Sequence, residues 1–329
     1  PAPSLPAGCY HAAERFPLSS FSEFRHMRAG VLAEVFGLAF PRGIKPQDML
    51  FLDTETTGLS GGAGTIAFEV GLGYVAGGQF VVEQFLMRDY PEEPFLLERV
   101  ATLLRAFPAV VTFNGRTFDV PLLQSRFLMH RMADVKVSEL HADVLHAARR
   151  VWKLRLGRCT LQRLEDAVLG VTREDDLPGA DVPKTYFQYL KDRDFAPIER
   201  ILEHNRQDVV SLAQLFFFLC KLYDKPETAV EPDDLLALAR AMDRRGAAAK
   251  AKKCYRMAAQ GERRAEAYAA MAAGEKRVGN TANAVKLYSA MLAHGDEPVL
   301  ACEALAKLYE HRLQSPEQAL TYTRQALLL

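Results

Sequence analysis

The sequence is poor in the features that mark secreted, zinc-built or membrane proteins. Its five cysteines form no Cys-x-x-Cys pair, and none has a histidine at zinc-site spacing, which excludes a zinc finger and a disulfide framework. No apolar run approaches the roughly 20 residues that a membrane-spanning helix needs. The first eight residues lack the basic and then apolar order of a secretory signal. We therefore expect a cytoplasmic protein with no membrane partner.

The chain also lacks net charge. Lys plus Arg and Asp plus Glu number 41 each, so no overall field attracts a polyanion. The balance is broken locally, because residues 240–264 hold nine cations against Asp243 and Glu262, and residues 149–158 hold five cations and no acid. Each stretch alone is typical of a solvated helix face; beside a nuclease site it would be a surface for phosphate groups.

At 329 residues the chain is longer than one hydrophobic core usually serves, so we expect two domains and an extension. Residues 1–45 are the predicted N-terminal extension, with one helix at 21–36. Residues 46–227 alternate strand-like and helix-like segments, which predicts an α/β domain with a mixed sheet flanked by helices. In residues 228–329 Ala, Leu, Arg and Lys dominate, which predicts an all-α domain.

Apolar or alternating runs predict the strands of the α/β domain, and amphipathic runs predict its helices. Strands are expected at residues 49–52, 65–75, 79–87, 109–113 and 140–143. A hairpin turn is expected at Ala76-Gly77-Gly78. Helices are expected at residues 94–107, 119–131, 144–152 and 196–223.

The all-α segment repeats a short pattern in which an alanine is followed, three or four residues later, by a tyrosine. The copies begin at Ala251, Ala284 and Ala319, which are 33 and 35 residues apart. Paired helices with a period of about 34 residues resemble tetratricopeptide (TPR) repeats. The Trp and Leu-Gly positions of that repeat are mostly missing here, so the helical hairpins are the firmer part of this prediction.

Acidic residues follow buried segments at three places. Asp53 and Glu55 end a buried strand two residues apart, so both face one side; the alternative is a solvated loop edge. Asp119 begins a helix after a strand and a turn, where it could also be a simple cap. His204 and Asp208 lie one helical turn apart, as a surface ion pair would.

Together these residues predict a metal site. Carboxylates on different elements can surround two divalent cations about 3.5–4 Å apart, an arrangement that hydrolyses phosphodiesters. One ion would activate the attacking water, and the other would stabilise the leaving 3′-oxygen. His204 is the expected general base and His141 the fallback, although His141 could simply end a strand whose neighbour Asp143 caps the next helix.

Three segments resemble the motifs of DnaQ-like DEDD exonucleases, in the order of that family. They are Phe51-Leu52-Asp53-Thr54-Glu55-Thr56-Thr57-Gly58-Leu59, Phe113-Asn114 through Phe118-Asp119, and His204 to Asp208. The resemblance covers residues 46–224. It implies a ribonuclease H-like fold, two Mg²⁺ or Mn²⁺ ions held by the four carboxylates, and stepwise release of nucleotides from a 3′ end.

A closer resemblance is to the YprB-like bacterial branch. It rests on Gly61-Gly62-Ala63-Gly64, His141-Ala142-Asp143-Val144-Leu145-His146 and Asp176-Leu177-Pro178-Gly179. Kinship implies a DNA-repair exonuclease that carries helical repeats and works beside a partner such as a helicase. One departure concerns the base: the histidine subclass places it five residues before the last Asp, whereas His204 has the four-residue spacing of the tyrosine subclass.

Several further residues are predicted to contact the nucleic acid. By family analogy Thr56 and Thr57 bind the terminal nucleotide, and Trp152 would stack on a base unless it is a core anchor. The other predicted contacts are Asn114, Phe118, Arg149 and Arg150. DNA with a single-stranded or frayed 3′ end is the favoured substrate; the alternatives are an exoribonuclease, or an inactive scaffold that binds partners through its helical repeats.

Overall fold

The computed structural model describes residues 8–58, 64–173 and 176–329. By its internal contacts the chain forms two compact units. The first contains Pro1–Arg149 and Arg158–Asp224, and the second contains Arg150–Gly157 and Lys225–Leu329. The predicted domain boundary at residues 227 and 228 stays a prediction.

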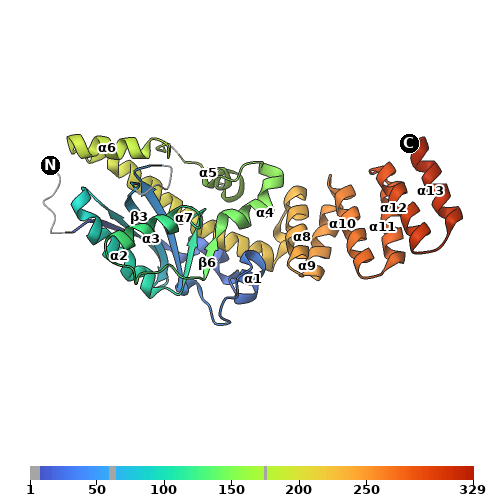
Figure 1. The fold of residues 1–329 in the computed structure, drawn as a ribbon, viewed down its shortest axis with the longest axis horizontal. Helices are drawn as coiled ribbons and strands as arrows, with labels where there is room; N and C mark the ends of the chain where they lie inside the picture. Colours follow the sequence, from blue (N-terminus) through green and yellow to red (C-terminus); the bar gives the residue numbers. More distant parts are fainter. Residues whose placement is uncertain (1–7, 59–63, 174–175) are drawn as a thin grey trace. The chain divides into compact units, whose positions relative to one another are not determined.

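The first unit is built on a six-stranded sheet with the strand order β1-β4-β3-β2-β5-β6. Figure 1 labels β3 and β6 among the helices of this unit. Its strands are β1 (Tyr10–Pro17), β2 (Met49–Thr56), β3 (Ala67–Ala76), β4 (Gln79–Leu86), β5 (Ala109–Thr112) and β6 (His141–Asp143). The first four strands in this order are antiparallel, whereas β5 pairs in parallel with both β2 and β6. Gly77 and Gly78, both with positive φ, make the predicted hairpin turn between β3 and β4. The mixed sheet expected from the sequence is confirmed.

Seven α-helices belong wholly or partly to the described part of this unit. They are α1 (Ala29–Phe36), α2 (Glu93–Ala106), α3 (Asp119–Met129), α4 (Val144–Leu156), α5 (Leu161–Leu164), α6 (Val182–Asp192) and α7 (Ala196–Asp224). Short 3₁₀ segments are η1 (Leu18–His26), η2 (Pro46–Asp48) and η3 (Tyr90–Glu92), and η4 (Glu165–Leu169) is a single π-helical turn. The four predicted helices are present; α5, α6 and η4 were not predicted.

Successive side chains of β2 point to opposite faces of the sheet and enter two separate hydrophobic layers. Phe51 contacts Phe80 and the α7 residues Phe216 and Phe217 on one face of the sheet. Leu50 and Leu52 point to the other face and join a buried cluster that includes the apolar side of α2. Because Asp53 and Glu55 have the same parity as Phe51, the alternation directs both acids toward α7.

Two glycines on β3 let α7 approach this face of the sheet closely. A Cβ built at Gly71 would lie 2.1 Å from Oδ1 of Asn205 and 2.9 Å from a methyl carbon of Val209, and one at Gly73 would lie 2.6 Å from Val209 and Phe80. Real Cβ atoms do not make contacts of this length. Glycine at these positions therefore sets the distance between the strand and the helix.

We expect Gly71→Ala to lower the free energy of unfolding by about 1–3 kcal/mol, because the added methyl group must push Asn205 or the helix aside. Urea denaturation measures this loss. Gly30→Ala is the control: a Cβ there meets nothing within 4 Å, so its stability should be unchanged or slightly higher. Equal stability of the two variants would show that α7 has room to move.

The N-terminal segment differs from its prediction. The single helix expected at 21–36 is wrong, since η1 and α1 are separated by Met27 and Arg28, whose ψ values of 116° and 152° are extended. Residues 10–17 were not predicted as a strand, yet β1 pairs with β4 along its whole length. This edge strand is polar and mostly exposed, so it lacks the apolar alternation by which strands are recognised.

The second unit contains six α-helices after the 3₁₀ segment η5 (Pro226–Thr228), and Figure 1 shows them following one another in chain order. They are α8 (Pro232–Arg244), α9 (Ala248–Ala258), α10 (Arg264–Arg277), α11 (Thr281–Ala293), α12 (Pro298–His311) and α13 (Pro316–Leu328). The recurring Ala251, Ala284 and Ala319 are all buried, which explains the pattern: small residues are needed where helices meet. The helical C-terminal region is confirmed, and its assignment to the TPR family stays a prediction.

Much of the positive charge in residues 240–264 is paired within this unit. Lys252, Lys253, Arg263 and Arg264 form ion pairs with Glu275, Glu227, Asp233 and Asp296. The surface is therefore less basic than the sequence suggests, which favours the solvated-face interpretation of this stretch. Among the helices of the described residues, none combines the length and the hydrophobicity needed to cross a membrane.

Candidate active site

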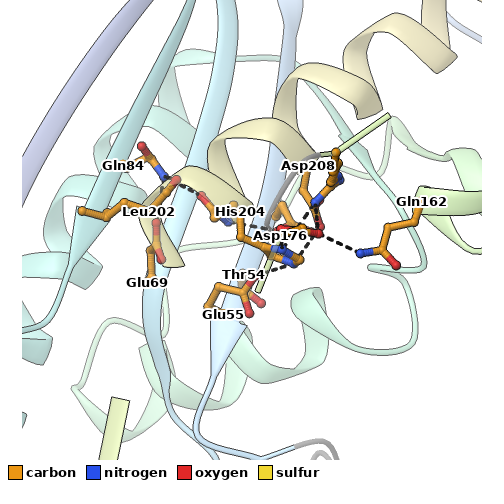
Figure 2. Close-up of polar contacts among 12 residues, drawn as sticks. Thr54, Glu55, Glu69, Gln84, Gln162, Asp176, Leu202, His204 and Asp208 are labelled. Carbon is orange, nitrogen blue, oxygen red and sulfur yellow. Dashed lines mark hydrogen bonds and ion pairs between the residues drawn. The ribbon is translucent and has the colours of Figure 1, made fainter. Parts of the chain in front are cut away.

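Glu55 of β2 and a histidine and an aspartate of α7 meet at one place, on the face of the sheet to which the alternation of β2 directs Glu55. Nε2 of His204 lies 3.8 Å from Oε1 of Glu55 and 3.8 Å from Oδ2 of Asp208. One atom of each of these three side chains lies within 4.8 Å of the other two. Figure 2 shows the three grouped together beside Asp176. We call this group, with Asp53 and Asp119, the acidic site.

Hydrogen bonds hold the two remaining acids. The hydroxyl group of Thr54 donates to Oδ1 of Asp119, which is 5% exposed at the first turn of α3. The side-chain amide of Asn205 donates to Oδ2 of Asp53 at 3.0 Å. Polar neighbours that orient metal ligands in this way commonly raise the affinity of a site.

Arg173 binds Asp208 and lies beside His204, with its Nη1 3.4 Å from Nδ1 of the imidazole. Its guanidinium donates to both oxygens of Glu165, at 2.7 and 2.6 Å, and to Oδ1 of Asp208. Glu165 is 1% exposed, so this ion pair is buried. Because Arg173 takes Oδ1, the other carboxylate oxygen of Asp208 faces His204 and the acidic site.

Asp176 holds the far nitrogen of His204. Its Oδ1 lies 2.7 Å from Nδ1 of the imidazole, and its Oδ2 accepts from Arg173 at 3.2 Å. Burial acts to raise the pKa of Asp176, but the hydrogen bond and the charge of His204 outweigh it and the pKa is lowered. An ionised Asp176 accepts the proton of Nδ1, which leaves Nε2 as the nitrogen that faces Glu55 and Asp208.

A fifth buried carboxyl group lies beside the site. Glu69 of β3 is paired in register with Glu55, is fully buried, and accepts from the amide of Gln84 at 2.8 Å. The same amide nitrogen of Gln84 also lies 3.2 Å from Oδ1 of Asn205. Figure 2 shows Glu69 and Gln84 together at this strand. The network fixes the orientation of the Asn205 amide, and through it that of Asp53.

Burial and mutual repulsion make these acids reluctant to ionise together. Burial, and then the charges of the neighbouring acids, raise the pKa of Asp53 and of Glu55 well above the ordinary range. Burial also raises the pKa of Asp119 to about 6, although hydrogen bonding acts to lower it. The pKa of Asp208 is raised by burial against the opposing charge of Arg173. Hard oxygen ligands with uncompensated negative charge fit a divalent cation, which would offset this repulsion.

We expect the raised pKa values of these acids to cost the metal-free protein stability as the pH rises from about 4 to about 8, opposed up to pH 6.5 by the lowered pKa of buried His141. A carboxyl group whose pKa is raised by folding keeps its proton to higher pH in the folded state, so stability is lost as the pH rises through the folded pKa. For Asp119 the window runs from 3.8 to about 6, and for Glu69, raised chiefly by burial, from 4.5 to about 8. The shift of Asp119 alone corresponds to about 3 kcal/mol.

Thermal melts in EDTA across this pH range measure the loss, and Mn²⁺ should reduce it by replacing the protons. Asp119→Asn should show a shallower slope than the intact protein in EDTA. A melting temperature that rises with pH from 6.5 to about 8, where His141 is neutral in both states, would contradict the expected repulsion.

The sequence-predicted substrate contacts are distributed around the site in different ways. Thr56 donates to the carbonyl oxygen of Gly58, and the hydroxyl group of Thr57 accepts the backbone N–H of Ile66, so both shape the chain after β2. Asn114 is exposed with a positive φ of 67°. Phe118 is half-buried directly before Asp119.

Trp152 is wrong as a predicted stacking residue. Its side chain is 1% exposed, so no face of the ring is open to a base, and the alternative interpretation as a core anchor holds. Arg149 is exposed and Arg150 half-buried on α4. Their predicted contacts with nucleic acid stay predictions.

His141, the fallback base, is not part of the acidic site. Its Nε2 lies 2.8 Å from the hydroxyl oxygen of Thr112, and burial followed by the charge of Arg116 lowers its pKa to about 4. Asp143 accepts the backbone N–H groups of Asn114 and Leu145. Asp143 thus caps α4, as the structural alternative expects, whereas His141 begins β6 instead of ending a strand.

Sequence reasoning did not identify Glu69, Glu165, Arg173 or Asn205 as site residues, and it quoted Asp176 only within a motif. Asp176 lies just before Pro178 and Gly179, which are residues typical of turns, and Arg173 lies three positions before Asp176. Nothing in their local spacing indicated that they meet α7. Of the glycine motif after β2, residues 61–63 lie outside the described residues, as does Leu59 of the first motif.

Comparison with known proteins identifies the family. The sequence profile of the RNase_H superfamily matches residues 50–220, more than half of the chain. The chain belongs to the RNase H superfamily. This range contains β3 to β6, all of β2 but its first residue, most of α7, and with them the acidic site. The RNase H-like fold class is thereby confirmed, and the family supports nuclease chemistry with divalent metal ions.

Two individual proteins are also similar to this RNase H superfamily chain. The Bacillus subtilis (strain 168) protein YprB, described as uncharacterized, is 34% identical over 216 residues, which are 64% of this chain and 52% of YprB. The chain thus spans about half the length of that relative. The family B DNA polymerase structure from the hyperthermophilic archaeon Pyrobaculum calidifontis matches with a TM-score of 0.42 and 15% identity, over 60% of this chain and 29% of the polymerase.

Proposed function

We propose that this chain is a metal-dependent 3′-to-5′ exonuclease of the DEDD type that hydrolyses DNA, with Asp53, Glu55, Asp119 and Asp208 holding two divalent cations. The observation that carries the proposal is the convergence of β2, α3 and α7 carboxyl groups whose charges raise one another's pKa. Surface ion pairs would lower the pKa of acids instead. Carboxylates that gather without enough cations of their own are suited to metal ions.

Mg²⁺ or Mn²⁺ bound there would supply a nucleophilic water and stabilise the leaving 3′-oxygen. The residues of the chain orient the ligands: Thr54 holds Asp119, Asn205 holds Asp53, and Arg173 holds one oxygen of Asp208. Fixing the carboxylates before substrate arrives lowers the cost of reaching the reactive geometry.

DNA is the proposed substrate and DNA repair the proposed setting, because Gly61-Gly62-Ala63-Gly64, His141 to His146 and Asp176 to Gly179 resemble the YprB-like branch. The helical second unit is proposed to bind a protein partner such as a repair helicase. Its ion-paired surface makes it a weaker candidate for gripping phosphate groups.

The test uses a 5′-labelled single-stranded DNA and its RNA counterpart, each incubated with the intact protein and Mg²⁺, Mn²⁺ or EDTA. We expect a ladder that shortens from the 3′ end of the DNA, that needs the metal, and that is lost in Asp119→Asn. A ladder on RNA alone would replace DNA with RNA as the substrate. If neither strand gives a metal-dependent product, the proposal is wrong, and the alternative of an inactive scaffold that binds partners remains.

A further inference from the structure

The imidazole of His204 is held in one orientation by its neighbours. It is 7% exposed, and Asp176 fixes Nδ1 at 2.7 Å. Among the described residues no hydrogen-bond partner lies at Nε2, and the nearest carboxylate oxygens, of Glu55 and Asp208, are both 3.8 Å away. Two metal–ligand bonds of about 2.1 Å together exceed this distance, so one ion can touch the nitrogen and each oxygen.

The outer contacts of the same group follow the pattern of a metal-bound histidine. A ligating histidine usually donates its other N–H to a carboxylate, which fixes the tautomer and makes the ligating nitrogen more basic. Asp176 does this for His204, and Arg173 holds the outer oxygen of Asp208 so that the inner one faces Nε2. The two contacts direct one nitrogen and one oxygen to the same point, next to Glu55.

We propose that His204 is a metal ligand through Nε2, forming with Glu55 and Asp208 a mixed nitrogen and oxygen site that selects Mn²⁺ over Mg²⁺. The inference rests on the proposed function only in placing a metal at the acidic site. It replaces the general-base role expected from the sequence. Imidazole is a better ligand for transition metals than for Mg²⁺, which favours oxygen donors, so one nitrogen is enough to shift the preference.

The spectroscopic signature of this site is nitrogen bound directly to the ion. Full-length protein loaded with one equivalent of Mn²⁺ should show, in pulsed EPR, the ¹⁴N coupling of a coordinated imidazole. His204→Gln should remove that coupling. His146→Gln, which changes an exposed histidine of α4, is the matched control and should retain it. A wild-type spectrum without ¹⁴N coupling overturns the proposal whether or not the variants fold.

Affinities supply the second measurement. His204→Gln should weaken Mn²⁺ binding roughly 10-fold or more, and Mg²⁺ binding, measured by competition, distinctly less; Asp176→Asn should weaken Mn²⁺ binding by roughly 10–100-fold, as loss of an outer contact does. Unchanged Mn²⁺ affinity in His204→Gln, with turnover lost, would instead establish His204 as the base. If ¹⁴N coupling is seen but no nuclease activity, the proposed exonuclease function is wrong and the metal-ligand role of His204 stands. If a DNA ladder is seen without the coupling, the exonuclease function stands and the metal-ligand role of His204 is wrong.

Discussion

Asp53→Asn is expected to release nucleotides well over about 100-fold more slowly. Loss of a residue that only orients a metal ligand costs roughly 10–100-fold, and Asp53 is a proposed ligand itself. The same substitution should make the metal-free protein more stable. The carboxylate of Asp53 is a proposed metal ligand, and an amide oxygen is a poorer one. The substitution keeps the shape of the side chain and an oxygen that can accept from Asn205. What changes is therefore the charge at the acidic site.

The gain in stability has the same cause as the loss of activity. Burial and the charges of Asp208, Asp119 and Glu55 raise the pKa of Asp53 well above the ordinary range, so ionising it costs more free energy in the folded protein than in the unfolded chain. A neutral amide removes that cost. In EDTA near pH 8 the melting temperature should rise by about 2–4 °C for each kcal/mol relieved. Sites that trade stability for activity behave in this way.

Glu98→Gln is the control, because Glu98 is an exposed acid of α2 with the same change of charge. It should alter neither the ladder nor the melting temperature. Two results would contradict the assignment: Asp53→Asn with full activity, or an inactive Asp53→Asn that also melts lower in EDTA, which would indicate a structural role for Asp53.

The parts of the fold that the sequence predicts are those with a strong local pattern. The apolar run of β2, the glycine turn after β3 and the long amphipathic α7 are all where the sequence places them. The edge strand β1 and the π-helical turn at Glu165 carry no such pattern, because each depends on a partner outside its own segment: β1 on β4, and Glu165 on Arg173, eight positions later.

The site divides in the same way. The inward acids are predictable, since strand and helix periodicity put Asp53 and Glu55, and then His204 and Asp208, on common faces. Of the residues that hold these groups, Arg173 and Asp176 lie outside every strand and helix expected from the sequence, and no period relates Asp176 to His204 across 28 positions of the chain. The prediction for Trp152 was wrong for a related reason. A tryptophan in a basic segment suggests a ring that stacks on a base, and only the packed structure shows that this ring is buried.

Arg173→Met is expected to lower the free energy of unfolding by about 3–5 kcal/mol, the cost of leaving a buried charge without its partner. Glu165 is 1% exposed and receives two hydrogen bonds from this guanidinium. Arg173→Met combined with Glu165→Gln should recover much of the loss, because no buried charge then remains at position 165. Arg163→Met is the control: its ion pair with Asp166 is about half exposed, so the change should stay within about 0.5 kcal/mol.

The loss of stability in Arg173→Met should depend on metal, and this dependence tests whether Arg173 also stabilises the acidic site. Arg173 also holds Oδ1 of Asp208, so its removal leaves a second acid uncompensated, one that a divalent cation can reach through the other oxygen. Urea melts in EDTA and in Mn²⁺ should therefore show a smaller penalty for Arg173→Met when Mn²⁺ is present. An equal penalty in both would mean that the guanidinium stabilises only Glu165. A smaller penalty in Mn²⁺ would mean that Arg173 offsets the charge of Asp208 in the metal-free protein, a role that the bound ion then takes over.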